Sequence, residues 1–124
     1  MMAIELPILN TRYSSVNPLF NLHGLLSPGI TGGYGGTVGC WAQVTENTLT
    51  VSIRVDPRNA EFTDGFILTG LPEELRPSVN TPDTAQQQLF LMKNGKIWLR
   101  SSADWKLQDR TEVNAIFIAP RRAS

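Results

Sequence analysis

The residues whose types could do chemistry lie close together at 100–106, in the segment Arg-Ser-Ser-Ala-Asp-Trp-Lys. Proteins hold sugars by stacking an aromatic ring on the C–H face of the sugar, while charged and amide side chains bond its hydroxyls. Arg100, Asp104 and Trp105 supply such groups in a predicted loop, and with His23 they are the candidate saccharide-binding residues. A structural role is the alternative, in which Trp105 closes one end of the core and Asp104 forms an Asx turn.

A catalytic constellation is not recognisable in the sequence. Nucleophilic catalysis needs a nucleophile beside a base, and the chain has one histidine, His23, and one cysteine, Cys40. Cys40 falls in an alternating apolar pattern, which is typical of an inert core thiol, and no zinc-ligand spacing is present. Glu73 and Glu74 are adjacent, so in an extended segment they point apart and do not form a glycosidase pair. We therefore expect a non-enzymatic protein without metal or cofactor, and a glycan-hydrolase fragment is the least favoured alternative.

Composition excludes several classes of partner. The chain has 124 residues, of which 41% are hydrophobic, enough for the core of one domain. Eleven basic and eleven acidic residues give a net charge of zero, so neither nucleic acid nor an anionic membrane is an expected partner. No apolar stretch approaches the roughly 20 residues that span a bilayer, so we expect no membrane insertion. The N-terminus lacks signal-peptide features, which predicts synthesis and retention in a reducing cytoplasm.

An alternation of apolar and polar residues begins at residue 37 and predicts antiparallel β-strands. We expect strands at 37–45 and 48–55, joined by a turn at 46–47, and another at 61–69 with a possible kink at Gly65. The pair Asn94-Gly95 between two apolar runs predicts a type I′ hairpin. A last strand begins at Val113, and roughly seven strands at short spacing indicate an all-β antiparallel sandwich, jelly-roll-like in character.

The N-terminal part differs from the rest of the chain. Residues 1–36 contain several prolines and no regular period, and they end in a run with five glycines at 28–36. That run lacks the Gly-Lys-Ser/Thr of a phosphate-binding loop, so a linker or tight turn is expected. We predict an N-terminal arm or docking segment at 1–36 and the β-sandwich domain at 37–124.

Four large apolar residues are candidates for a subunit interface. Trp41 and Trp98 share their strand faces with polar residues, and Ile116 and Ile118 form a second apolar face on the last strand. A strand that is apolar on both faces lies either at the centre of a sandwich or against another subunit. Large apolar side chains on otherwise polar faces are typical of interfaces.

The segment 71–77, Leu-Pro-Glu-Glu-Leu-Arg-Pro, has a mechanical interpretation. Its two prolines restrict their own φ angles and bias the preceding residues to extended conformations. Leu71 and Leu75 can then fill the edge of the core while the chain crosses between sheets. Arg76 can cap carbonyl groups or pair with an acid. We expect this segment to be structural rather than chemical.

The order of strand, Leu-Pro-x3-Arg-Pro segment, Asn-Gly hairpin, Trp105 and closing strand at Phe117 resembles the small β-rich end modules of bacteriophage tail fibres and receptor-binding proteins. The resemblance covers roughly residues 37–119 and differs at Leu75, where such modules usually have glycine. It implies a homotrimeric head in the virion that binds bacterial cell-surface glycan and contacts other phage tail proteins. The alternative is a virion assembly, trimerisation or decoration module without receptor binding.

Overall fold

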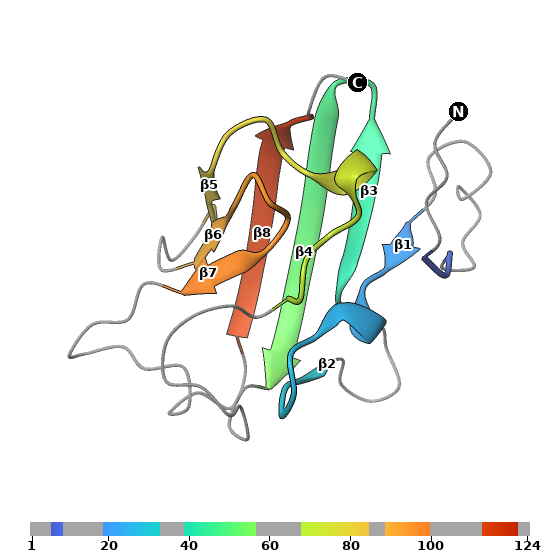
Figure 1. The fold of residues 1–124 in the computed structure, drawn as a ribbon, viewed down its shortest axis with the longest axis vertical. Helices are drawn as coiled ribbons and strands as arrows, with labels where there is room; N and C mark the ends of the chain where they lie inside the picture. Colours follow the sequence, from blue (N-terminus) through green and yellow to red (C-terminus); the bar gives the residue numbers. More distant parts are fainter. Residues whose placement is uncertain are drawn as a thin grey trace.

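The computed structural model describes residues 6–8, 19–32, 39–56, 68–84, 89–99 and 113–121, which form two antiparallel β-sheets (Figure 1). The five-stranded sheet and the three-stranded sheet together confirm the predicted all-β sandwich. The strands are β1 (Phe20–Asn21), β2 (Thr31–Gly32), β3 (Trp41–Thr45), β4 (Thr48–Asp56), β5 (Thr81–Pro82), β6 (Leu89–Leu91), β7 (Ile97–Leu99) and β8 (Val113–Pro120), and two 3-10 turns cover His23–Leu25 (η1) and Glu73–Leu75 (η2).

The five-stranded sheet is built around β4, the longest strand of the part of the chain that the structure describes. Strand β3 pairs with one edge of β4 and β8 with the other, while β1 lies outside β3 and β2 pairs with the end of β4. The turn at Glu46 and Asn47 joins β3 to β4, as predicted. Because apolar and polar residues alternate along β4, one face of the sheet enters the core and the other faces outward.

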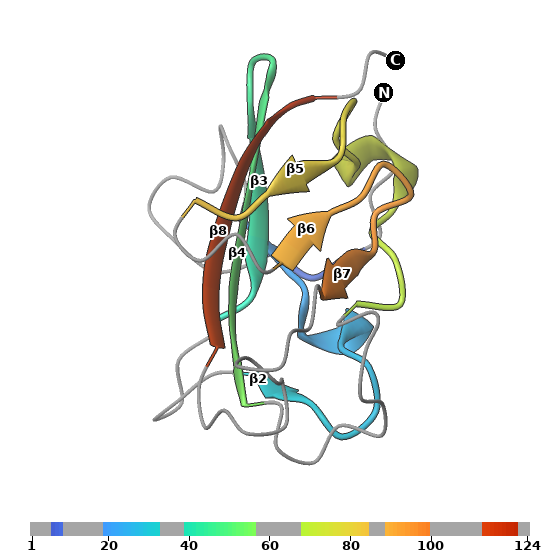
Figure 2. The same ribbon diagram turned by 90° about the vertical axis from the view of Figure 1, so that its left-hand side faces the viewer.

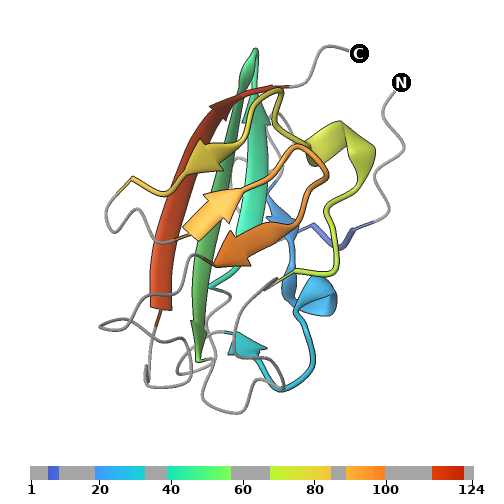
Figure 3. The same ribbon diagram turned by 60° about the vertical axis from the view of Figure 1, so that its left-hand side comes forward.

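The three-stranded sheet covers only the inner face of the larger one. Figure 2 shows β5, β6 and β7 on one side of β4 and β8, and no described strand or 3-10 turn on the other side. Figure 3 shows the same three strands crossing in front of the larger sheet. Strand β8 is tied to the segment around β5, because the Thr84 N–H donates to the Ile116 carbonyl at 2.9 Å and the Ser78 N–H to the Pro120 carbonyl at 3.0 Å. No described strand or 3-10 turn therefore covers the outer face of the five-stranded sheet over β3, β4 and β8.

The core consists of the inward side chains of both sheets and of the segments that connect them. Strand β8 alternates strictly: Val113, Ala115 and Phe117 are buried, whereas Ile116 and Ile118 are exposed. The expectation that this strand lies at the centre of the sandwich is therefore wrong for the single chain, since β8 pairs with β4 alone among the described strands of its sheet and only one face is covered. The alternative of a subunit contact stays a prediction.

Part of the predicted N-terminal arm belongs to the sandwich. Strand β1 pairs with β3, the Asn21 N–H donates to the Pro7 carbonyl at 2.7 Å, and Phe20, Leu22 and Ile30 are buried in the core. Residues 19–32 thus contribute a strand and core side chains to the β-sandwich, and the division of the chain at residue 36 stays a prediction. The sequence did not predict the burial of these apolar side chains because their spacing is irregular. Their burial depends on pairing with β3 and not on a local period.

The Leu-Pro-x3-Arg-Pro segment has the structural role that its sequence predicted. Leu71 and Leu75 are fully buried, and the Arg76 Nε donates to the Leu71 carbonyl oxygen at 2.9 Å. The segment rests on the β6–β7 hairpin, where the Leu71 N–H donates to the Gly95 carbonyl at 2.9 Å. Two of the features that carry the family resemblance, this segment and the hairpin, are thus packed against each other.

The hairpin was predicted correctly, but its turn type was not. A type I′ turn needs a positive φ at both central residues, and here Gly95 has φ +84° while Asn94 does not. The loop has three residues, with the Gly95 N–H donating to the Met92 carbonyl and the Met92 N–H to the Lys96 carbonyl. This is the arrangement of a type I turn followed by a glycine bulge. The core residues Leu91 and Ile97 set the register between β6 and β7, and this register selects the three-residue loop.

Candidate functional site

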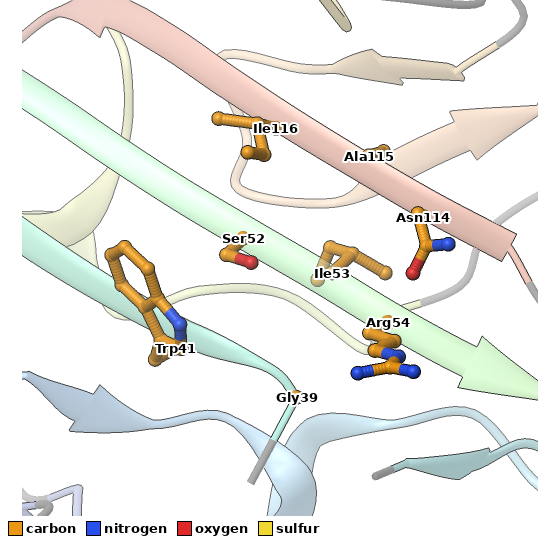
Figure 4. A pocket seen from close by; sticks show the side chains of 8 residues that line it. All are labelled: Gly39, Trp41, Ser52, Ile53, Arg54, Asn114, Ala115 and Ile116. Carbon is orange, nitrogen blue, oxygen red and sulfur yellow. The ribbon is translucent and has the colours of Figure 1, made fainter. Parts of the chain in front are cut away.

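A shallow depression of about 440 Å³ lies on the outer face of the five-stranded sheet, over β3, β4 and β8 (Figure 4). Among the described residues, its lining consists of Gly39, Trp41, Ser52, Ile53, Arg54, Asn114, Ala115 and Ile116. Two of these residues, Trp41 and Ile116, were predicted as interface candidates from the sequence. They lie on different strands, and Ser52 of β4 stands between them.

The strand register explains why these side chains meet. Trp41 is opposite Ser52 in the β3–β4 pair, and Ser52 is opposite Ile116 in the β4–β8 pair. Arg54 is opposite Asn114. Directly opposite residues have Cβ atoms about 4.5–5.5 Å apart, so each set forms a row across the sheet. Because Ser52 and Arg54 are two residues apart on one strand, both rows present their side chains to the same outer face.

Gly39 allows the chain entering β3 to pass close beneath Arg54. A Cβ atom at position 39 would lie 2.8 Å from the Arg54 Cβ and 2.9 Å from the Arg54 carbonyl oxygen. Both distances are shorter than side chains tolerate, so the residue at this position must lack a side chain. The stem of Arg54 therefore lies directly over the backbone at Gly39, which fixes where its guanidinium group emerges.

His23, whose saccharide-binding role stays a prediction, lies beside the entry to β3. Its Nε2 accepts long hydrogen bonds from the N–H groups of Gly39 and Cys40, at 3.3 and 3.4 Å. Its own N–H donates to Asn21 Oδ1 at 2.9 Å. His23 thus holds the entry to β3 and does not line the depression.

Cys40 is the buried thiol that the alternating pattern predicted. It is fully buried, and its Sγ donates to the Arg54 carbonyl oxygen at 3.6 Å. Burial raises the pKa of the Cys40 thiol, because the thiolate would lose its hydration. It therefore lies within the sheet as a small hydrophobic side chain and offers no nucleophile to the depression.

Trp98 lies on the opposite side of the sandwich from Trp41. Its neighbour Ile97 is buried, so Trp98 points outward from the three-stranded sheet, as its position in the sequence predicted. It is opposite Phe90, with ring centroids 6.3 Å apart and planes inclined by 49°, and Pro82 is the next residue in the same row. The two predicted tryptophans therefore cannot form one patch within a single chain.

The structure brings together some of the predicted residues and leaves others apart. Trp41 and Ile116 share the depression, and Ile118 is the next outward residue on β8. Arg100, Asp104 and Trp105 lie outside the described residues, so their saccharide-binding role stays a prediction. Three polar lining residues, Ser52, Arg54 and Asn114, were not predicted from the sequence. Their alternation marked them as outward-facing, but nothing local indicated that their strands are neighbours.

The arrangement can bind a polar ligand with an apolar face. Trp41 is half-buried and presents an aromatic ring, while Ser52 offers a hydroxyl, Asn114 an amide and Arg54 a guanidinium group (Figure 4). No pair of carboxyl groups lines it among the described residues, so these residues supply no acid and base for hydrolysis. The aromatic ring, the hydroxyl, the amide and the guanidinium group can take part in recognition by stacking and hydrogen bonding.

The described residue ranges contain neither a metal-ligand cluster nor a membrane-spanning helix. Nowhere in them do three or more His, Cys, Asp or Glu side chains gather in a way that could hold a metal ion. No helix in the described part of the chain is long and apolar enough to cross a membrane. Comparison of the chain with protein-family models, curated proteins and solved structures finds no match. The resemblance to phage end modules therefore stays a prediction that rests on its motifs.

Proposed function

We propose that this chain is a non-enzymatic recognition module of a phage tail, fibre or baseplate, and that it binds bacterial cell-surface saccharide through the depression. The observation that carries the binding role is the half-buried Trp41 beside Ser52, Arg54 and Asn114, on a sheet face that no described strand or 3-10 turn covers. The phage setting comes from the family resemblance. The same resemblance supplies the homotrimer as the expected assembly.

A sugar would use the two rows of the depression differently. The C–H face of the ring would stack on the Trp41 indole, and Ser52 and Asn114 would bond hydroxyl groups. The lining residues lie mainly on paired β-strands, so little conformational freedom is lost when a ligand binds. A shallow site of this kind binds weakly, and several copies on one assembly could raise the avidity by about 10²–10⁴.

The test is binding of the purified chain to cell walls from candidate host bacteria, with tryptophan variants as probes. We expect Trp41→Leu to lower the bound fraction strongly, because the stacking surface is lost. Trp98→Leu is the matched control, since it removes a half-buried tryptophan from the other sheet. Circular dichroism checks that each variant is folded.

The outcomes separate the candidate sites. Loss of binding in Trp105→Leu with full binding in Trp41→Leu would move the site to the segment 100–106. Equal binding by all three variants would contradict a role for any of these tryptophans in recognition. Equal loss in Trp41→Leu and Trp98→Leu, with both folded, would contradict the assignment of binding to the depression.

A second candidate function, virion assembly without receptor binding, is favoured by the exposed isoleucines on β8. Ile116 and Ile118 are 46% and 57% exposed and are successive outward residues of the strand. Large exposed aliphatic side chains beside an aromatic ring resemble the core of a subunit interface. If they form one, Ile118→Thr should dissociate the trimer in analytical ultracentrifugation, whereas Val79→Thr, at an exposed residue outside β8, should not. A trimer that binds no cell wall would favour assembly as the function.

A further inference from the structure

Asn94 combines a chemically reactive sequence with an exposed side chain. An asparagine that precedes glycine can lose its side-chain amide, because the backbone nitrogen of the glycine attacks the side-chain carbonyl carbon and no β-carbon obstructs it. Asn94-Gly95 is the only Asn-Gly pair in the sequence. Asn94 lies exposed in the loop between β6 and β7, so water reaches its carboxamide.

The reaction is a cyclisation followed by a hydrolysis. A bond forms between the Gly95 nitrogen and the Asn94 Cγ, the bond from Cγ to Nδ2 breaks, and ammonia leaves with the proton of the Gly95 N–H. Water then opens the cyclic imide at one or the other of its carbonyl groups. The product is an aspartate or an isoaspartate at position 94, and no oxidant or reductant takes part.

Hydrogen bonds hold both reacting groups in the folded chain. The Gly95 N–H donates to the Met92 carbonyl at 2.8 Å, and Gly95 is buried. The Asn94 Oδ1 accepts from the Lys96 N–H at 3.0 Å, which fixes the carboxamide in an Asx turn. The Gly95 N–H must leave the Met92 carbonyl before the nitrogen can give up its proton and attack. The closed hairpin therefore suppresses the reaction.

A contact with a distant segment keeps the hairpin closed. The loop between β6 and β7 lies beside the segment that leads into η2 (Figure 3), and the Leu71 N–H donates to the Gly95 carbonyl at 2.9 Å. Leu71 is also held by Arg76, whose Nε donates to its carbonyl oxygen at 2.9 Å. Gly95 cannot leave its position without separating from Leu71.

We propose that Asn94 is a modification site whose deamidation requires the contact between Gly95 and Leu71 to open. The rate then follows the fraction of chains in which this contact is open. Isoaspartate carries the main chain through the side-chain carbon and lengthens it by one atom. An added Cβ at Gly95 would already lie 2.7 Å from the Leu71 nitrogen, so the longer chain has no room to close again. Each opening that ends in isoaspartate is therefore permanent.

The test is peptide mapping by mass spectrometry of the full chain during incubation at mildly alkaline pH, with and without urea. Loss of the amide raises the mass of the peptide that contains Asn94, and chromatography separates aspartate from isoaspartate. We expect the reaction to be about tenfold or more slower in the folded chain than in urea. Asn80, whose Oδ1 accepts from the Lys93 N–H, is the internal control and should stay intact, because the β-carbon of the following threonine hinders attack. Equal rates with and without urea would overturn the protection, and an intact Asn94 in urea would overturn the site.

Two variants test whether the contact with Leu71 controls the reaction. Arg76→Ala frees the Leu71 carbonyl, and we expect it to raise the rate in the folded chain by about 5–30-fold, since loss of one hydrogen bond enlarges the open population by that factor. Gly39→Ala acts on the other sheet, through overlap with Arg54, and should raise the rate less. Equal acceleration in both variants, or an unchanged rate in Arg76→Ala, would overturn control by this contact.

A measurement on the unaltered chain avoids any dependence on how the variants fold. Hydrogen exchange at the Gly95 amide and deamidation at Asn94 require the same opening. We expect both rates to rise in parallel as urea is added below the unfolding midpoint. A different urea dependence of the two rates would overturn the proposal that they share one opening.

Discussion

Gly95 is the residue whose replacement should most clearly damage the junction between the hairpin and the Leu-Pro-x3-Arg-Pro segment. Its φ of +84° is unfavourable for any other residue. A Cβ atom there would also lie 2.7 Å from the Leu71 backbone nitrogen and 2.9 Å from the Leu71 carbonyl oxygen. Both contacts are with backbone, which cannot move aside as the end of a flexible side chain would. Gly95→Ala therefore combines backbone strain with steric overlap.

Three other glycines separate these two effects. Gly70 has φ +132°, but an added Cβ would meet nothing closer than 3.9 Å, so its replacement tests strain alone. Gly39 lacks a positive φ, but an added Cβ would lie 2.8 Å from Arg54, so its replacement tests overlap alone. Gly24 has neither problem, since no atom lies within 4 Å of an added Cβ. Together they form a matched series of Gly→Ala substitutions.

The expected losses in the free energy of unfolding follow from these contacts. Backbone strain should reduce it by about 1–3 kcal/mol for Gly70→Ala. Overlap should reduce it by about 1–3 kcal/mol for Gly39→Ala. Gly95→Ala should approach the sum, about 2–6 kcal/mol, out of a total of about 5–15 kcal/mol for a typical domain. Gly24→Ala should be close to neutral or stabilise by up to about 1 kcal/mol, because alanine restricts the unfolded chain.

Urea unfolding followed by circular dichroism would measure the series, and equal slopes would show that the variants unfold from comparable states. If Gly95→Ala were no worse than Gly70→Ala, the close approach of the hairpin to Leu71 would contribute nothing to stability. If Gly24→Ala were as damaging as the others, the losses would reflect a general intolerance of alanine. Either result would refute the reasoning from the local contacts.

Arg76→Ala should lower the free energy of unfolding by about 1–2 kcal/mol in urea, because the Leu71 carbonyl loses the hydrogen bond from Nε. Asp83→Ala should lower the thermal stability, with a loss of about 1–3 kcal/mol, since the buried Asp83 carboxylate accepts from the Leu89 N–H at 3.1 Å. Asp83→Asn retains an acceptor oxygen and should lose less. Burial raises the pKa of the Cys40 thiol above its ordinary value of 9.0. The contribution of the buried thiol to the free energy of unfolding is therefore fully present below pH 9.0. It decreases as the pH rises through the folded-state pKa, because the thiol of the unfolded chain ionises first. That part of the alkaline decrease, up to about 1.4 kcal/mol per pH unit, should be absent in Cys40→Ala, and an identical pH profile in the variant would contradict the burial argument.

Local features of the sequence were sufficient for the fold class and for several individual roles. Alternation at Cys40 indicated a buried thiol, and the proline pattern indicated that Leu71 and Leu75 fill the core edge. The pair Asn94-Gly95 located the hairpin correctly. These predictions succeeded because each depends on residues that are near one another along the chain.

The type of the hairpin turn could not be predicted from Asn94-Gly95 alone. The pairing of Leu91 with Ile97 leaves room for a three-residue loop, and Gly95 then meets Leu71 of a distant segment. The identity of two adjacent residues contains no information about the strand register or about the contact between Gly95 and Leu71. The same limitation hid the contribution of Phe20, whose burial depends on its pairing with Ala42 of β3.

The sequence by itself determined which residues of each strand face the core, because side chains alternate with a period of two whatever the neighbouring strand is. Only the tertiary structure decided which strands are neighbours. Trp41, Arg54 and Asn114 form one depression because β4 pairs with β3 on one edge and with β8, far away in the sequence, on the other. A shift of one residue in either register would turn these side chains into the core, and the burial of the apolar residues between them excludes that shift.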